Sequence, residues 1–195
     1  MFYLSKNQLI GQAQAMPQDK QSDWSNCFAL LAKKSIHPAL KAFYQQGVVA
    51  ASTPITEVPM VALDFETTGL DPNRDSIISI GLLPMSVSRI HCNTARHWII
   101  KPETRLHSSS IVVHGITHSA VADAPEFLTL IDELLAHLQG KVAVVHHSPI
   151  ERRVLHAALK RDIHDGQEFP VIYTIALDAK LHLTLSLTLK HTLLI

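Results

Sequence analysis

The amino-acid sequence predicts an α/β domain, a mixed β-sheet flanked by helices, with a helical extension at its N-terminus. After residue 57 the order of candidate elements is strand, strand, strand, helix, strand, helix, strand, which is typical of a mixed sheet with helices against it. Before that residue, apolar side chains recur at the three- and four-residue spacing of helices. Hydrophobic residues make up 47% of the 195-residue chain and charged residues 17%, so a packed core is expected rather than disorder.

Residues 1–56 are interpreted as a helical N-terminal extension and a linker. The helical spacing is broken at Ile36-His37-Pro38 and ends at Gly47, so two short helices are expected. Prolines and hydroxyl residues between positions 51 and 59 indicate the linker. Two interpretations of the extension stay open: helices that pack on the main domain, or an arm that docks a partner or guides substrate. The apolar residues at helical spacing are Trp24, Phe28, Leu31, Ala32, Ala39, Leu40 and Phe43.

The main domain is predicted to span residues 57–180 and to begin with three strands. Short apolar runs at 61–65, 76–83 and 96–100 are separated by turn residues, as in an antiparallel meander. A helix is expected next, because a stripe of apolar residues follows at helical spacing. The stripe consists of Phe127, Leu130, Ile131, Leu134, Leu135 and Leu138.

Three further elements complete the predicted order, followed by an atypical tail. They are a buried strand at 142–145, a helix over 150–159 and a strand at 169–175. In residues 181–195 leucines alternate with polar residues, which indicates an amphipathic strand if it indicates structure. An edge strand and a tail that does not belong to the ancestral domain are both open interpretations. A truncated chain and a tail that replaced the last helix are the two alternatives for how the domain ends.

The balance of charge and the few cysteines exclude several classes of protein. Lys+Arg and Asp+Glu both number 17, which counts against a non-specific duplex binder but little against an enzyme that grips a strand end. Cys27 and Cys92 do not make a disulfide scaffold. The first ten residues lack the pattern of a signal peptide and no apolar run reaches about 18 residues, so we expect a cytoplasmic protein without a membrane segment.

Two carboxylates at the end of the first strand are the strongest functional signal. Successive strand residues point to opposite faces, so Asp64 and Glu66 share one face, about 6.5 to 7 Å apart. Two carboxylates aimed at one spot repel unless a cation lies between them, and oxygen ligands suit Mg²⁺ or Mn²⁺. The turn Thr67-Thr68-Gly69 would leave backbone N–H groups beside the metal. A solvated strand end is the alternative interpretation.

The residues around this pair resemble the first motif of the DnaQ-like exonucleases. That family includes the proofreading epsilon subunit of bacterial DNA polymerase III and the histidine-bearing DEDD exonucleases. Two later segments also resemble the family: Ile111 to Thr117 and His146-His147-Ser148-Pro149-Ile150-Glu151, its second motif. The first motif reads Asp64-Phe65-Glu66-Thr67-Thr68-Gly69-Leu70-Asp71-Pro72, then Asp75-x-Ile77-Ile78-x-Ile80-Gly81. The resemblance covers about residues 58–180.

The resemblance implies a ribonuclease-H-like fold and a 3′-5′ exonuclease that acts on single-stranded DNA or RNA ends. It implies two divalent ions, Mg²⁺ or Mn²⁺, held by Asp64, Glu66 and Glu151, and a polymerase or other protein as a candidate partner. Glu151 stands where the family has Asp, so a helix-start carboxylate stabilised by the helix dipole is the alternative. The implied substrate-binding residues are Thr67, Thr68, Gly69, Leu70, His114 and His147. For His147, a structural hydrogen bond is the alternative.

The third motif of the family, His-x-x-x-x-Asp, does not occur after Tyr173. In the family it supplies the general base and the last metal ligand. Weak activity or none is therefore expected of these 195 residues. The alternative function is a catalytically inactive nuclease-fold module that binds nucleic acid or a protein partner. DNA and RNA both stay open as substrates, because contacts to the 2′-OH do not appear in motifs.

Overall fold

The computed structural model describes residues 23–69, 71–146, 148–166 and 169–178. Its centre is a five-stranded sheet in the order β3-β2-β1-β4-β5. β1 pairs antiparallel with β2, and β2 with β3, while β4 runs parallel to both β1 and β5. The predicted meander and mixed sheet are confirmed. The strands are β1 (Met60–Thr67), β2 (Ile77–Met85), β3 (Arg96–Ile99), β4 (Val142–Val145) and β5 (Val171–Tyr173).

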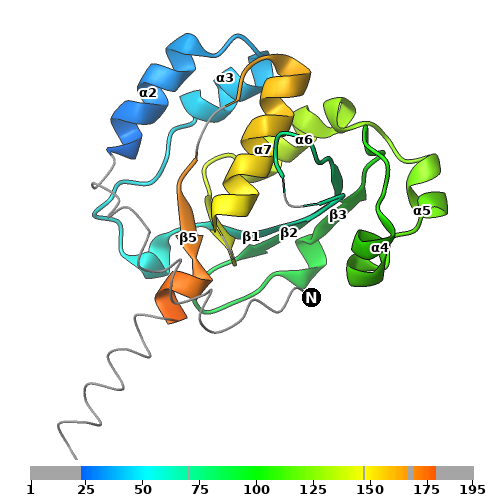
Figure 1. Cartoon of the computed structure of the whole chain (residues 1–195). Helices are drawn as coiled ribbons and strands as arrows, with labels where there is room; N and C mark the ends of the chain where they lie inside the picture. The colour runs from blue at the N-terminus through cyan, green and yellow to red at the C-terminus, as the bar shows by residue number, and fades with distance from the viewer. Residues whose placement is uncertain (1–22, 70, 147, 167–168, 179–195) are drawn as a thin grey trace, which may run out of the picture.

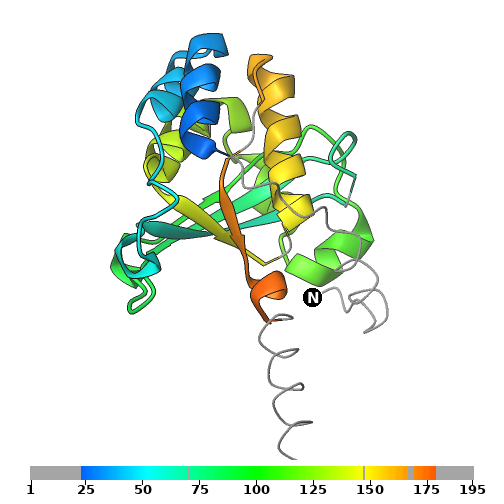
Figure 2. The same cartoon turned by 90° about the vertical axis from the view of Figure 1, so that its left-hand side faces the viewer.

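Helices α2, α3, α6 and α7 gather over one face of this sheet (Figures 1 and 2). Contacts run from α2 to α3, from α3 to α6 and from α6 to α7. The predicted apolar stripe of α6 is confirmed, because Ile131, Leu134 and Leu135 are buried in the main core. The helices are α2 (Trp24–Lys34), α3 (Pro38–Gln45), α6 (Phe127–Leu138) and α7 (Ser148–Ile163), with short 3-10 turns at Ile55–Glu57 and Cys92–Thr94.

The two described helices of the N-terminal extension share the main core with the sheet. Phe28 of α2 packs against Phe43 and Tyr44 of α3, with ring centroids 5.5 and 5.0 Å away. Between the helices, the backbone N–H of Ile36 donates to buried Asp165 beyond the end of α7 (2.8 Å). The extension therefore packs on the domain, as one of the two interpretations requires. The boundary at residues 56–57 stays a prediction, and residues 1–22 and 181–195 lie outside the described part.

Two short helices, α4 (Ser108–His114) and α5 (His118–Ala122), were not predicted. They follow β3 and lie at the end of the molecule away from β5 (Figure 1). Together with the segment before them they cover Ile78 of β2 in a small second apolar cluster. Helices this short contain too few turns to produce a visible apolar period. Gly115 ends α4 with a φ of 74°, a left-handed conformation that favours glycine.

The last predicted strand is shorter than expected. β5 ends at Tyr173, and residues 174–178 are helical rather than extended. No helix within the described residues is long and apolar enough to cross a membrane.

Candidate active site

The carboxylates of Asp64 and Glu66 lie on the central strand, β1, at its C-terminal end. The alternation predicted from the sequence is present: Leu63 is buried and Phe65 packs against the core, whereas Asp64 is exposed and Glu66 half-buried. The ladder with β2 shifts register between Glu66 and Thr67, so the strand pairing becomes irregular directly after the second carboxylate.

The folded chain disfavours the ionised forms of both carboxyl groups. Although the residue is exposed overall, partial burial of its carboxyl group raises the pKa of Asp64, partly offset by a hydrogen bond from the backbone of Phe65 and by the charge of His146. Burial also raises the pKa of Glu66; the negative charge of Asp64 raises it further, and His114 lowers it. The pair is thus close enough to interact. A divalent cation would neutralise both groups, and their oxygen donors fit Mg²⁺ or Mn²⁺.

Two histidines flank the pair. His114, at the end of α4, accepts a hydrogen bond from the backbone N–H of Ile116 at Nδ1 (3.0 Å). Its Nε2 is buried and has no hydrogen-bond partner among the described residues. His146, directly after β4, contacts the hydroxyl of Thr174 through Nδ1 (2.9 Å). Because Nδ1 of His114 accepts a hydrogen bond, the neutral ring of this residue carries its proton on Nε2. The same side chain is the one that lowers the pKa of Glu66.

Glu151 lies in the first turn of α7, as predicted, and is only 7% exposed. Within the described ranges, no three His, Cys, Asp or Glu side chains are arranged to hold a metal ion together. The structure places Asp64 and Glu66 together on β1, but it does not group Glu151 with them in a three-residue cluster, so Glu151 stays a predicted ligand. Leu70 and His147, two predicted substrate contacts, lie outside the described residues.

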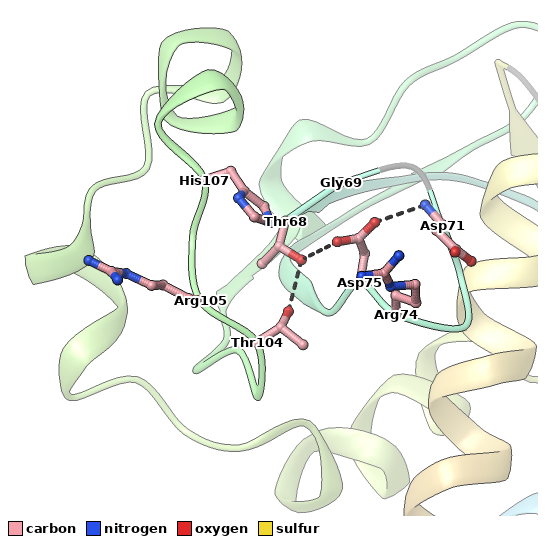
Figure 3. A pocket seen from close by; sticks show the side chains of 8 residues that line it. All are labelled: Thr68, Gly69, Asp71, Arg74, Asp75, Thr104, Arg105 and His107. Atoms are coloured by element: carbon pink, nitrogen blue, oxygen red, sulfur yellow. Dashed lines mark hydrogen bonds between the residues drawn. The ribbon is translucent and has the colours of Figure 1, made fainter.

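The turn after β1 is held by a network of hydroxyl groups (Figure 3). The Thr67 hydroxyl donates to the carbonyl of Gly69 (2.6 Å). Thr68 is 1% exposed, and its hydroxyl donates to Asp75 Oδ1 (3.0 Å), accepts the backbone N–H of Ser76 (3.0 Å) and contacts the hydroxyl of Thr104 (3.0 Å). The side chain of Thr68 thus fixes the turn, and its predicted contact with substrate stays a prediction.

A pocket of about 670 Å³ opens beside this turn and was not predicted. Residues from two segments form its walls, and the described ones are Thr68, Gly69, Asp71, Arg74 and Asp75 in the first segment and Thr104, Arg105 and His107 in the second (Figure 3). The sequence signal for the first wall was the Asp-Pro-Asn-Arg-Asp run, whose acidic residues commonly bond to nearby backbone in turns. No signal pointed to the second wall, which follows β3 far along the chain.

Comparison with known proteins identifies the domain that carries this pair. Residues 61–185 match the RNase_T family, described as an exonuclease. The chain belongs to this exonuclease family. The recognition of a DnaQ-like exonuclease from its motifs is thereby confirmed.

The chain is also similar to named DNA polymerase III proteins. The chain is 32% identical over 121 residues to a PolC-type DNA polymerase III from Thermotoga maritima, covering 62% of this chain and 9% of that protein. It is 31% identical over 100 residues to the epsilon subunit of DNA polymerase III from Rickettsia felis, covering 51% of this chain and 43% of that protein. The chain thus spans less than half of either relative.

Solved structures of exonuclease I share the fold. A zinc-bound E. coli exonuclease I in complex with single-stranded DNA superposes with a TM-score of 0.54 at 12% identity, covering 63% of this chain and 29% of that chain. Exonuclease I from Methylocaldum szegediense gives a TM-score of 0.51 at 15% identity, covering 60% and 27%. The predicted ribonuclease-H-like fold is confirmed.

Proposed function

We propose that the chain is a metal-dependent 3′-5′ exonuclease that shortens single-stranded nucleic acid from its 3′ end. The observation that carries the proposal is the pairing of Asp64 and Glu66 at the end of β1, inside the region that matches the exonuclease family. Burial and mutual repulsion raise the pKa of Glu66, and burial raises that of Asp64, so both would gain from a bound cation.

Asp64 and Glu66 would hold Mg²⁺ or Mn²⁺ in this function, with Glu151 from α7 as a further ligand. When two such ions are bound, they lower the pKa of a water molecule and stabilise charge on the attacking and leaving oxygens. The backbone of the turn 67–69, fixed by its hydroxyl network, would orient the terminal nucleotide beside the carboxylates. His114 would donate from Nε2 to that nucleotide. Leu70 and His147 stay candidate contacts.

We expect cleavage by these 195 residues to be slow. In the family the third motif supplies the general base, and residues after Tyr173 in this sequence contain no His-x-x-x-x-Asp. Loss of a general base commonly costs about 10² to 10⁴ in rate. Because the relatives are DNA polymerase III proteins, we propose a polymerase as a partner of the chain. We also propose that the chain is cytoplasmic.

The test is shortening of a 5′-labelled single-stranded oligonucleotide, as DNA and as RNA, in millimolar Mn²⁺. The wild-type chain should give a slow ladder of products that lose nucleotides from the 3′ end, and Asp64→Asn should abolish it. Asp123→Asn is the matched control, because Asp123 is exposed at the end of α5. A longer form of the chain, extended by the third-motif helix of a relative, should cleave the oligonucleotide faster than the 195-residue chain does.

Three outcomes would overturn the proposal. Digestion that is independent of Asp64 would place the chemistry elsewhere or in a contaminant. Products shortened from the 5′ end would refute the direction. Binding without cleavage, by both the chain and its extended form, would favour the inactive nucleic-acid-binding module.

A further inference from the structure

The pocket beside the turn contains cationic side chains that have no partner in the described structure. Arg74 and Arg105 line it from its two walls; in the view of Figure 3 Thr68 and Thr104 lie between them, and the Arg105 side chain extends to the side away from Arg74. Both arginines are exposed, and neither forms a side-chain hydrogen bond or ion pair with any described residue. The ring of His107 also lines the pocket. The two arginines thus line a concave surface in which they form no ion pair with a described residue.

The acidic residues of the pocket are already engaged by the turn. Asp75 accepts the Thr68 hydroxyl at Oδ1 and the backbone N–H of Asp71 at Oδ2 (2.8 Å). Asp71 in turn accepts the backbone N–H of Asn73 (3.0 Å). These carboxylates therefore hold the loop in shape, while the guanidinium groups keep their donors for a ligand. Guanidinium groups match the oxygens of phosphate esters in geometry and charge.

The position of the pocket connects it to the proposed catalytic pair. Gly69 lines the pocket and follows Glu66 by three residues, which is at most about 10 Å of extended chain. A strand whose 3′ end lay at the carboxylates could therefore continue into the pocket. Since the chain has a formal net charge of zero, binding of such a strand depends on local cations rather than on an overall positive field.

We propose that this pocket is a second substrate subsite, in which Arg74 and Arg105 bind phosphodiester groups of a single-stranded nucleic acid upstream of its 3′ end. The proposal rests on the proposed function for the direction of the strand, but the binding itself does not require cleavage. Backbone contacts of this kind are independent of base sequence and depend strongly on salt. The hydroxyl network of Thr68, Ser76 and Thr104 joins the two walls of the pocket.

The test measures binding with cleavage stopped by EDTA. A fluorescent oligothymidylate of about ten nucleotides is titrated with the 195-residue protein by anisotropy at several salt concentrations. The double variant Arg74→Gln/Arg105→Gln should weaken binding about tenfold at low salt, and the slope of log K against log salt should fall by about 1.4, or 0.7 per single-strand phosphate. The matched control is Arg89→Gln/Arg96→Gln, two exposed arginines around the β2–β3 connection, far from the pocket in sequence.

The outcomes separate this subsite from the proposed function. If the two double variants bind the oligonucleotide equally and with equal salt slopes, the subsite proposal is wrong, even if Asp64-dependent cleavage occurs. Arginine-dependent binding without any cleavage would support the subsite and count against the exonuclease proposal. If thymidine monophosphate competes as strongly as the oligonucleotide, the pocket holds a free nucleotide and the strand path is wrong. Failure of the wild-type protein to bind the oligonucleotide would also overturn the subsite.

Discussion

The carboxylate of Asp75 fills the space that a side chain at position 69 would need. A Cβ atom placed on Gly69 would collide with the carboxyl carbon and both carboxyl oxygens of Asp75. That carboxylate cannot simply turn aside, because it accepts hydrogen bonds from the Thr68 hydroxyl and the Asp71 backbone. Glycine at 69 and aspartate at 75 therefore form one unit, which fixes the turn directly after Glu66.

Replacing Gly69 with alanine should unfold this unit locally. The carboxylate of Asp75 would have to give up one or both hydrogen bonds, at a cost of about 1 to 3 kcal/mol. We expect Gly69→Ala to lower the free energy of unfolding by that amount in urea denaturation. Gly81→Ala is the control, since a Cβ there meets nothing within 4 Å. In an Asp75→Ala background the Gly69→Ala change should cost much less; equal costs in both backgrounds would contradict the steric explanation.

Divalent metal should stabilise the folded chain through Asp64 and Glu66. A cation that binds only the folded state raises the melting temperature by linkage, by about 3 to 6 °C at ten times Kd for a chain of this size. Asp64→Asn should lose most of that shift, while Asp123→Asn should retain it. Differential scanning fluorimetry with Mn²⁺ and Mg²⁺ measures the effect. Equal shifts in both variants would place the metal elsewhere.

Without metal, the same pair should make stability depend on pH. The folded-state pKa values of Asp64 and Glu66 are raised above their ordinary values of 3.8 and 4.5. Their contribution to the free energy of unfolding is therefore fully present below the unfolded-state pKa, and it is lost as the pH rises through the folded-state pKa. In EDTA, Asp64→Asn should melt above wild type at neutral pH, and the difference should shrink toward pH 3.8. Because Asp64 is partly open to solvent, we expect a modest effect. A difference that is constant with pH would contradict it.

Arg152 should stabilise the packing of the N-terminal extension against α7, the helix that carries Glu151. Its guanidinium lies 5.7 Å from the centre of the Trp24 ring and donates to the Tyr173 hydroxyl (2.9 Å). A cation–π contact and a hydrogen bond of this kind together contribute about 1 to 2 kcal/mol. Arg152→Met should lower stability by that amount and speed hydrogen exchange in α2. Arg153→Met, at the exposed neighbouring position, should do neither; equal behaviour would show that the contact does not hold α2.

Much of the fold follows from periods that short sequence windows already contain. The period of two in β1 places Asp64 and Glu66 on one face whatever the rest of the chain does. The period in α6 likewise predicts its buried stripe. In contrast, α4 and α5 are too short to show a period, and the change from strand to helix after Tyr173 has no apolar break to mark it. Local pattern therefore predicted the strands and the longer helices and missed the two short helices.

The candidate site was predictable only where its residues are close in sequence. The contact of Thr68 with Thr104 joins positions 36 residues apart and depends on where the chain returns after β3. The pocket and its arginines depend on the same return, so no local pattern could indicate them. Glu151 was placed correctly at the start of a helix, but its distance from the β1 pair depends on how α7 packs on the sheet. Tertiary packing, rather than local propensity, decides these features.

We expect Nε2 of His114 to contact the substrate, whereas Nδ1 of the same ring stabilises the fold. Because Nδ1 accepts the backbone N–H of Ile116, asparagine can keep that bond through its side-chain oxygen and lose only the Nε2 donor. We expect His114→Asn to melt close to wild type but to lower kcat/KM on a single-stranded oligonucleotide by about two- to tenfold, the value of one neutral hydrogen bond. His114→Phe, which loses both nitrogens, should reduce stability as well. The exposed neighbour gives the control, His118→Asn, which should change neither quantity. Full activity in His114→Asn would show that the buried Nε2 does not contact substrate.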